Sequence, residues 1–348
     1  MFLNEINLHN SLWQRLMARR TRLPHALLLA GPRGLGKFAL AQAFASGLLC
    51  EQPGMDGRSC GTCIACGWMA QGNHPDFRLL QPEALAAGDD GADEGKGDKK
   101  KASQQITIDQ VRELDDFLNV GTHRSGLRVI LVHPAEAMNR STANALLKSL
   151  EEPGAGTVFL LVSDEPKRLL PTIRSRCQFE AVAVPKRSEA QAALQAAGLA
   201  EADRWLALAG GAPYLALELA AAKQGEWMSR LSTRLTSADI DVHVAAAELD
   251  KMLRDAKGSI PLRLIVDYVQ RWTVDLTLTA SGLPVRYFVG QQDTIMSVVR
   301  RLSVPVLVGF YRRLVEARRQ AEQPLNGRLF LENLFLDYRS LFANNHGT

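Results

Sequence analysis

The sequence predicts an α/β domain built on a parallel sheet, followed by a region made of helices. Three apolar runs, His25–Ala30, Arg128–Val132 and Thr157–Val162, are each too short for a helix and are best explained as buried strands. Helical segments separate these runs. Strands that form continuous apolar runs are typical of a parallel sheet covered on both faces. After about Pro185 we find no further run of this kind.

Two segments between these strands have helical character. Ala39–Leu49 follows the first strand and its glycine-rich turn. Ser141–Glu152 carries apolar residues three and four positions apart and is stopped by Pro153. The periodic positions in the second segment are Ala143, Leu146, Leu147 and Leu150. We therefore expect helices to alternate with the strands.

The segment from about residue 83 to 104 breaks this alternation. Glu83–Ser103 contains six acidic residues, four lysines and four glycines, with Leu85 as its one large apolar residue. Such a segment cannot bury enough surface to offset the entropy lost on ordering. We predict a disordered insert that acts as a solvated tether, with a partner-binding tail as the alternative.

The remainder of the chain is predicted to be helical. Ser188–Ala222 is rich in alanine and leucine and is interrupted by Gly210-Gly211-Ala212-Pro213. From Trp227 onward, apolar residues recur at helical spacing. The two clearest stripes are Leu262, Ile265, Val269, Trp272 and Leu276, and Leu331, Leu334, Phe335, Tyr338, Leu341 and Phe342. We predict three domains, at 1–184, 185–225 and 226–348; whether the last stripe packs internally or against another subunit stays open.

Composition excludes several classes of protein. The chain has 348 residues, 46% hydrophobic and 22% charged, as in soluble globular proteins. No apolar run approaches the roughly 18 residues of a membrane span, so we expect no membrane partner. Met1–Asn10 lacks the pattern of a secretion signal, which favours a cytoplasmic location. The net charge of +4 is too small to imply nucleic-acid binding by itself.

The turn after the first strand has the pattern of a phosphate-binding loop. Gly31, Gly34, Gly36 and Lys37 stand at the positions where backbone N–H groups cradle phosphate and a lysine reaches it. The next position normally holds a serine or threonine whose hydroxyl binds Mg²⁺, and here it is Phe38. We expect a vestigial nucleotide site; whether ATP still binds stays open.

The second position for magnesium chemistry also differs. The strand Arg128–Val132 is followed by His133 and Pro134, where an ATPase needs an acidic residue, and Glu136 lies further along. Phosphoryl transfer depends largely on metal electrostatics. We therefore expect no Mg²⁺ site and no intrinsic ATPase activity.

Four of the five cysteines lie close together. Cys50, Cys60, Cys63 and Cys66 have the spacing of thiolates around one ion, and this fits a closed, structural Zn²⁺ site in a module at about 50–66. An iron–sulfur cluster and unliganded thiols are the alternatives. His74-Pro75-Asp76 offers other ligands, but is better explained as the approach to the next strand.

Four segments resemble those of the clamp-loader AAA+ family of bacterial DNA polymerase III. Ala143–Pro153 resembles the NALLKxLEEP signature, and Ser175-Arg176-Cys177 resembles the SRC motif of these subunits. The four-cysteine excursion after the phosphate loop is similar to theirs as well. Pro324–Tyr338 is similar to the end of the family's last domain. The altered nucleotide site resembles the subunits of this family that do not act as motors.

The resemblance implies an AAA+ core, a helical lid and a collar that joins five subunits in a hetero-oligomeric ring. It implies gamma/tau-type motor subunits and the delta subunit as partners, and action on the sliding clamp and primed DNA during replication. It further implies that Arg176 is an arginine finger acting on the ATP of a neighbouring motor, with Arg174 as its local competitor. Pro213 stands where motors carry a sensing arginine.

Two other functions are weighed against this one. The first is an active gamma-type motor ATPase, which ATP turnover by the isolated chain would reveal. The second is a zinc-dependent DNA-binding protein, for which the basic cluster Arg19, Arg20 and Arg22 is the sequence feature. A steep salt dependence of DNA binding would favour that alternative.

Overall fold

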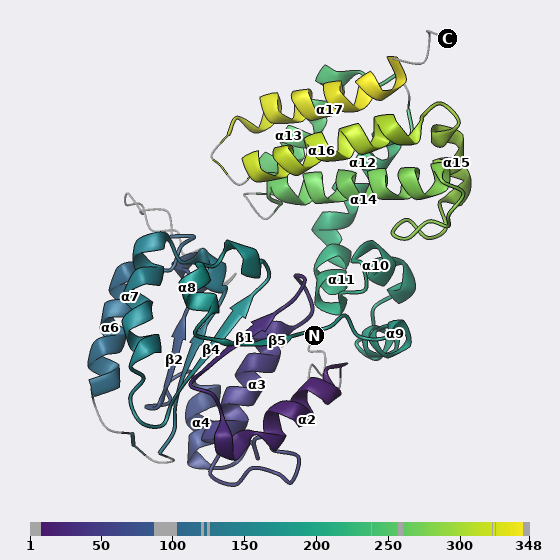
Figure 1. Cartoon of the computed structure of the whole chain (residues 1–348). Coiled ribbons are helices and arrows are strands. Elements are labelled where there is room, and N and C mark those ends of the chain that lie inside the picture. Colours follow the sequence, from purple (N-terminus) through teal and green to yellow (C-terminus); the bar gives the residue numbers. More distant parts are fainter. Residues whose placement is uncertain are drawn as a thin grey trace. The chain divides into compact units, whose positions relative to one another are not determined.

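The computed structural model describes residues 8–86, 103–119, 122–123, 126–237, 239–256, 260–321, 323 and 325–343. The chain forms two compact units, Met1–Pro185 and Lys186–Thr348, which we describe separately (Figure 1). Of the predicted insert, the described part includes a single helical turn, Glu83–Ala86. The amide of Ala84 at that end donates to the carbonyl of Ser103 at the other, at 3.0 Å. Residues 87–102 lie outside the described part.

The first unit contains a five-stranded sheet in which every pairing is parallel. The strands are β1 (Ala26–Ala30), β2 (Phe77–Leu80), β3 (Arg128–Val132), β4 (Thr157–Ser163) and β5 (Gln178–Ala181). Their order across the sheet is β2-β3-β4-β1-β5. The three predicted strands are confirmed as β1, β3 and β4, and β2 starts directly after Asp76 as expected. Strand β5 has only four residues, and most of them are exposed, so its sequence contains no apolar run. This strand was not predicted.

Helices cover both faces of this sheet. The helices of the unit are α2 (Asn10–Ala18), α3 (Lys37–Leu49), α4 (Ile64–Ala70), α5 (Glu83–Ala86), α6 (Ile108–Asn119), α7 (Arg140–Glu151) and α8 (Pro171–Arg174). Short 3₁₀ turns are η1 (Arg20–Arg22), η2 (Ala135–Ala137) and η3 (Pro166–Arg168). The two predicted helices are confirmed as α3 and α7. The α7 helix begins where the Asn139 side chain accepts from the Thr142 amide at 2.9 Å, an N-cap.

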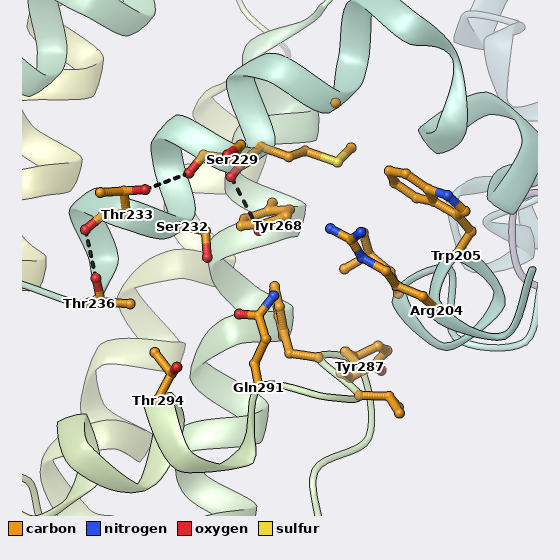
Figure 2. A pocket seen from close by; sticks show the side chains of 15 residues that line it. Arg204, Trp205, Ser229, Ser232, Thr233, Thr236, Tyr268, Tyr287, Gln291 and Thr294 are labelled. Carbon is orange, nitrogen blue, oxygen red and sulfur yellow. Dashed lines mark hydrogen bonds between the residues drawn. The ribbon is translucent and has the colours of Figure 1, made fainter. Parts of the chain in front are cut away.

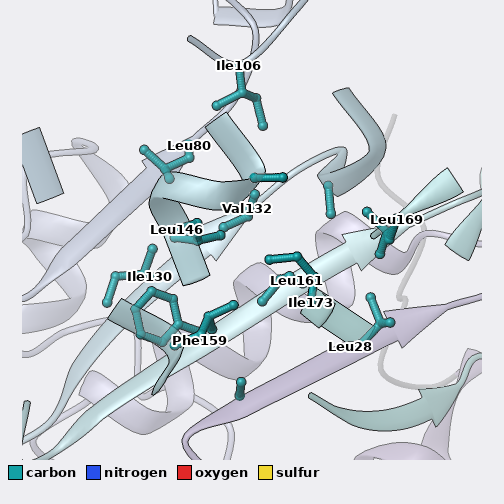
Figure 3. Close-up of a cluster of buried hydrophobic side chains, with 14 of the residues drawn as sticks. Leu28, Leu80, Ile106, Ile130, Val132, Leu146, Phe159, Leu161, Leu169 and Ile173 are labelled. Carbon is teal, nitrogen blue, oxygen red and sulfur yellow. The ribbon is translucent and has the colours of Figure 1, made fainter. Parts of the chain in front are cut away.

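Alternation along the strands explains the two layers. Successive side chains of a strand point to opposite faces. One set, including Leu28, Ile130 and Phe159, packs with residues of α6, α7 and α8 in a buried core (Figure 3). The other set faces α3, which contacts β1, β3 and β4. Because both faces are covered, the strands are apolar at nearly every position.

Among the described residues of the second unit, every regular element is a helix. Its helices are α9 (Arg187–Ala196), α10 (Ala202–Leu208), α11 (Pro213–Ala220), α12 (Ala222–Leu235), α13 (Val242–Asp255), α14 (Leu262–Ala280), α15 (Gln292–Val299), α16 (Val304–Gln320) and α17 (Gly327–Ala343). Helices α9, α10 and α11 pack together; α13 packs on α17 and α14 on α16 (Figure 1). The further division of this unit at about residue 225 stays a prediction.

A buried hydrogen-bonded chain ties three helices of the second unit together. The Trp272 indole donates to the Tyr338 hydroxyl at 3.0 Å, and that hydroxyl donates to the Leu235 carbonyl at 2.6 Å. Burial raises the pKa of Tyr338 far above its usual range, because the apolar surroundings disfavour the phenolate. The hydroxyl therefore stays protonated and keeps its role as donor.

Among the described residues, no single helix has both the length and the apolar character needed to cross a bilayer. Helices α15 and α16 reach that length and composition only when taken together, across a bend of 106°.

Candidate functional sites

The phosphate loop lies at the carboxyl end of the sheet. The register pairs Ala30, the last residue of β1, with Ser163 at the end of β4, so the loop after β1 meets the loop after β4. Gly34 and Gly36 have φ of 79° and 81°, values that favour glycine. A Cβ on Gly31 would lie 2.4 Å from the Val182 carbonyl oxygen. The predicted glycines are thus needed for the backbone path of the loop itself.

Lys37, the predicted phosphate-binding lysine, is buried and fully engaged within the chain. Its Nζ donates to the carbonyls of Gly31 at 2.8 Å and Pro32 at 2.6 Å, and forms an ion pair with Asp164 Oδ1 at 2.5 Å. An ammonium group has three N–H donors. Two of them are used in hydrogen bonds to backbone carbonyls, and the positive charge is paired with the Asp164 carboxylate.

An aromatic pair stands beside the lysine. The Phe38 ring stacks on the His133 imidazole, with ring centroids 4.6 Å apart and planes inclined by 23°. Burial lowers the pKa of His133 to about 4, and Lys37 acts in the same direction while Asp164 opposes it. His133 is therefore neutral near pH 7. The structure brings together Phe38 and His133, the two positions at which the sequence predicts that magnesium ligands are missing.

Glu136 does not extend toward the phosphate loop as a free acid. Its Oε1 accepts from the backbone amides of Asp164 at 2.8 Å and Glu165 at 3.2 Å. This carboxylate lies on η2, after β3, and fixes the start of the loop that follows β4. Glu136 thereby orients the segment that carries Asp164.

The four predicted cysteines converge on one point. Their sulfur atoms all lie within 4.8 Å of one another, and the closer pairs are 3.6 Å for Cys50–Cys66 and 3.9 Å for Cys50–Cys63 and Cys60–Cys66. A tetrahedral Zn²⁺ with Zn–S bonds of ~2.3 Å holds its sulfurs about 3.8 Å apart. The donor set and its spacing fit a closed structural metal site.

Hydrogen bonds from backbone amides favour the thiolate form of some of these sulfurs. The amides of Cys60, Cys63 and Cys66 donate to the sulfurs of Cys50, Cys60 and Cys63 at 3.3, 3.3 and 3.4 Å. Hydrogen bonds from the backbone of Thr62 and then Cys63 lower the pKa of Cys60 to about 6. Burial raises the pKa of Cys66 to about 12. Without a metal the cluster therefore holds both thiolate and thiol at neutral pH.

The cysteine module is anchored on helices α2 and α3. The Trp13 indole of α2 donates to the Asp56 carbonyl at 2.8 Å. A Cβ on Gly47 of α3 would lie 2.4 Å from the Gly57 carbonyl oxygen, and one on Gly57 would lie 2.3 Å from the Met17 sulfur. The backbone of the module thus lies in close contact with both helices. His74, the alternative ligand, instead accepts from the Asp76 amide at 3.0 Å through Nδ1.

Arg176 lies between α8 and β5 with its side chain about one-third exposed. Its Nη1 donates to the Thr172 carbonyl at 2.9 Å, and Nη2 forms an ion pair with Glu151, the last residue of α7. Arg174, its sequence competitor, is exposed. Cys177 packs against the buried core, and burial raises its pKa to about 11. The fifth cysteine thus packs at the edge of the apolar core and is separate from the four-cysteine cluster.

Comparison with known proteins decides the family. The family described as "DNA polymerase III, delta subunit" matches residues 8–185. DNA polymerase III subunit delta' of Pseudomonas aeruginosa is 38% identical over 270 residues, which cover 76% of this chain and 75% of the relative. The chain belongs to the delta' family of DNA polymerase III clamp-loader subunits. The predicted AAA+ clamp-loader resemblance is confirmed, and the chain is a replication protein.

Other relatives include further delta' subunits and the tau subunit of DNA polymerase III. The delta' subunit of Escherichia coli is 38% identical over 210 residues, covering 59% of this chain and 57% of the relative. The tau subunit of Escherichia coli is 32% identical over 156 residues, or 45% of this chain and 21% of the relative. A solved gamma subunit-related protein of Thermotoga maritima covers 95% of this chain and 99% of its own at 19% identity, with a TM-score of 0.46. That last likeness supports no argument about function.

Sequence reasoning missed two acidic partners at these sites. Asp164 pairs with Lys37, and Glu151 pairs with Arg176. Asp164 directly follows β4, which ends one residue beyond the predicted strand Thr157–Val162. Parallel strands end at one edge of a sheet, so Asp164 could have been placed near Lys37 once β4 was known to lie beside β1. Glu151 lies within the NALLKxLEEP signature, but nothing in its spacing indicates contact with the SRC arginine.

A hollow in the second unit offers no comparable chemistry. It measures about 330 Å³ and is lined by residues of α10, α12, α14 and the segment leading into α15 (Figure 2). Hydroxyls of Thr233 and Thr236 donate to carbonyls of their own helix at 3.0 and 2.7 Å. The Arg204 guanidinium pairs with Glu201 at 2.8 Å. These three side chains are thus engaged by their own helix or by Glu201.

Proposed function

We propose that this delta' subunit is a non-catalytic stator of the clamp loader that completes the ATP site of a neighbouring motor subunit. The observation that carries the proposal is the engaged phosphate loop. Its lysine is matched by Gly31, Pro32 and Asp164, and a Phe38–His133 stack stands where oxygen ligands for Mg²⁺ would be needed. Phosphoryl transfer without a positioned metal loses its main electrostatic aid.

Arg176 is the proposed trans arginine finger. A guanidinium is planar and permanently charged, and it can present two parallel donors to phosphate oxygens. Arg176 is partly exposed. Its guanidinium contacts the Glu151 carboxylate at the end of α7 and the Thr172 carbonyl of α8. An arginine supplied in trans accelerates phosphoryl transfer by roughly 10³–10⁵ in P-loop enzymes. The contacts of Arg176 with α7 and α8 support this role, because they hold its guanidinium in one orientation.

Zn²⁺ is the proposed occupant of the cysteine cluster. Four thiolates leave no open position, so the ion would be structural and would hold the module against α2 and α3. The spacing of the sulfurs and the amide donors around them support zinc over unliganded thiols.

The proposed partners follow from membership in the family. They are gamma/tau-type motor subunits and the delta subunit in a five-membered ring, and through that ring the sliding clamp and primed DNA. Residues 185–225 are the proposed lid and 226–348 the proposed collar. As a part of the bacterial replication machinery, the chain would act in the cytoplasm.

The first test is steady-state ATP hydrolysis by the purified chain with Mg²⁺, beside a Lys37→Ala variant that controls for contaminating ATPases. We expect no turnover above that control. Turnover that disappears in Lys37→Ala would identify the chain as a gamma-type motor and overturn the stator role.

A further inference from the structure

We propose that Asp164 closes the phosphate loop to nucleotides, because its carboxylate occupies the position on the Lys37 ammonium that phosphate oxygens would take. This inference rests on the proposed non-motor role and goes beyond it by naming the residue that excludes the ligand. The ligand class is the polyphosphate of a nucleoside di- or triphosphate.

The geometry leaves the lysine unavailable to an incoming anion. The Lys37 side chain is 2% exposed, whereas the Asp164 side chain is 26% exposed. An approaching phosphate would therefore meet the carboxylate before the ammonium. Like charges in close contact repel, more strongly where the site is partly shielded from water. Nucleotide binding would have to break the Lys37–Asp164 ion pair and place the phosphate next to the Asp164 carboxylate.

Asp164 is held in this place from two sides. Ser163, which precedes it, is paired in register with Ala30 at the end of β1. The Asp164 amide donates to Glu136 at 2.8 Å, and Glu136 comes from the turn after β3. The backbone that carries the carboxylate is thus fixed by both neighbouring strands. The ion pair is a built feature of this sheet edge.

The same geometry explains why a phosphate loop persists without a magnesium ligand. The glycines are required by the positive φ of Gly34 and Gly36 and by the approach of Gly31 to Val182. Lys37 joins the ends of β1 and β4 by its contacts with Gly31 and Asp164. Each retained residue of the motif has a structural role that needs no nucleotide.

The test measures ADP binding by isothermal titration calorimetry on the full chain, in buffer without added Mg²⁺. Asp164→Asn keeps the shape of the side chain and removes its charge. We expect the Kd for ADP to fall at least tenfold in this variant relative to the unaltered chain. Adding Lys37→Ala to Asp164→Asn should abolish the gain, because the ammonium is the group set free.

Glu165→Gln is the matched control, since it removes one negative charge from the next residue and leaves the Lys37 pair in place. It should leave the Kd for ADP unchanged. An equal gain in Glu165→Gln would attribute the effect to net charge and overturn the proposal. So would ADP binding by the unaltered chain as tight as that of Asp164→Asn.

Folding of each variant is checked by circular dichroism and thermal melting, and Asp164→Ser serves as a second charge-removing variant. Absence of any gain in a folded Asp164 variant would also overturn the proposal. These outcomes leave the arginine finger untouched, because that role is measured as ATP turnover by the assembled ring. Hydrolysis by the unaltered chain alone would instead overturn the non-motor role.

Discussion

Arg176 combines exposure with a fixed orientation. The Glu151 carboxylate and the Thr172 carbonyl each bind one end of its guanidinium. An exposed ion pair of this kind contributes little stability, about 0–1 kcal/mol. Its effect is to restrict the rotamers of a long side chain, which lowers the entropy lost when the arginine meets a phosphate. The contacts thus serve orientation more than stability.

Replacing Arg176 by lysine or alanine should leave folding and ring assembly intact. Turnover at the motor site that it faces should fall by roughly 10³ or more, because a lysine cannot present the planar pair of donors. ATP hydrolysis by the reconstituted ring measures this. Arg174→Lys is the matched control and should have little effect; a loss in Arg174→Lys with none in Arg176→Lys would transfer the finger to Arg174.

Gly47 lies within helix α3, but we expect that replacing it by alanine would not stabilise the chain. Alanine normally stabilises a helix interior over glycine by about 1 kcal/mol. A Cβ at Gly47 would lie 2.4 Å from the Gly57 carbonyl oxygen, a backbone atom that can move only with the cysteine module. We expect Gly47→Ala to destabilise the chain by roughly 1–3 kcal/mol in chemical denaturation.

Gly309 provides the control for this prediction. It lies within α16, and a Cβ there meets nothing within 4 Å. Gly309→Ala should be neutral or stabilising by up to about 1 kcal/mol. Equal effects of the two substitutions would show that the cysteine module does not pack on α3 as described.

Among the elements, we expect the order of the cysteine module to depend on a bound metal as well as on its sequence. Its cysteines lie in a loop and a short helix, α4, whose buried residues are Ala65 and Cys66, so little apolar burial holds the module. Metal binding can therefore supply much of the free energy that holds such a module. The anchors on Trp13, Gly47 and Gly57 transmit its order to α2 and α3.

The affinity of the module for Zn²⁺ should fall as the pH is lowered. The metal-bound form holds four thiolates, whereas the metal-free form keeps a proton on Cys66, whose pKa is about 12. Acid therefore favours the metal-free form. Below about pH 6 Cys60 also takes up a proton, so the loss of affinity per pH unit should steepen there.

Competition with a chromophoric chelator across pH 5–8 measures this dependence. Cys63→Ser is the variant control and should bind zinc much more weakly over the whole range. An affinity independent of pH, or a purified chain that carries no zinc and takes up none, would contradict a four-thiolate site.

Helix α17 carries buried apolar residues on one face and exposed apolar residues elsewhere. Leu331, Leu334, Phe335, Tyr338 and Leu341 are all buried within the second unit. Leu329 and Leu336 are 58% and 44% exposed on the same helix. The predicted stripe is thus used for internal packing. Any contact of α17 with another subunit would have to use other positions.

At the scale of the whole molecule, the chain forms two compact units that hold different features. The first holds the phosphate loop, the cysteine module and the SRC arginine, and the second is an array of helices. Each unit has a core of its own, with Phe159 buried in the first and Trp272 in the second. Separate cores predict separate responses to substitutions.

Cys63→Ser and Tyr338→Phe should destabilise different units and act independently. Tyr338→Phe leaves the Trp272 indole and the Leu235 carbonyl without their partner, at a cost of roughly 1–3 kcal/mol. Effects of distant sites usually add within about 0.5 kcal/mol. Hydrogen exchange should show reduced protection in the first unit for Cys63→Ser and in the second for Tyr338→Phe.

The double variant completes that experiment. Its pattern of exchange should equal the sum of the two single patterns. Loss of protection in both units from either single substitution would mean that the chain unfolds as one cooperative body.

The sequence by itself determined the parts of this protein that depend on neighbouring residues. Continuous apolar runs identified β1, β3 and β4, because strands buried on both faces require them. The spacing of four cysteines indicated one metal cluster, and the phosphate-loop and SRC motifs indicated the clamp-loader family. The short strand β5 was not predicted, since four residues of mixed exposure carry no periodic signal.

Only the tertiary structure decided which charged groups meet. Lys37 pairs with Asp164 because sheet order places β4 beside β1, and Arg176 pairs with Glu151 because α8 packs on α7. These residues are far apart in the chain, and a charge pattern along the sequence does not encode such partners. Burial of the apolar faces fixes the order of the strands and the packing of the helices. That arrangement places these charged side chains next to one another, where they pair.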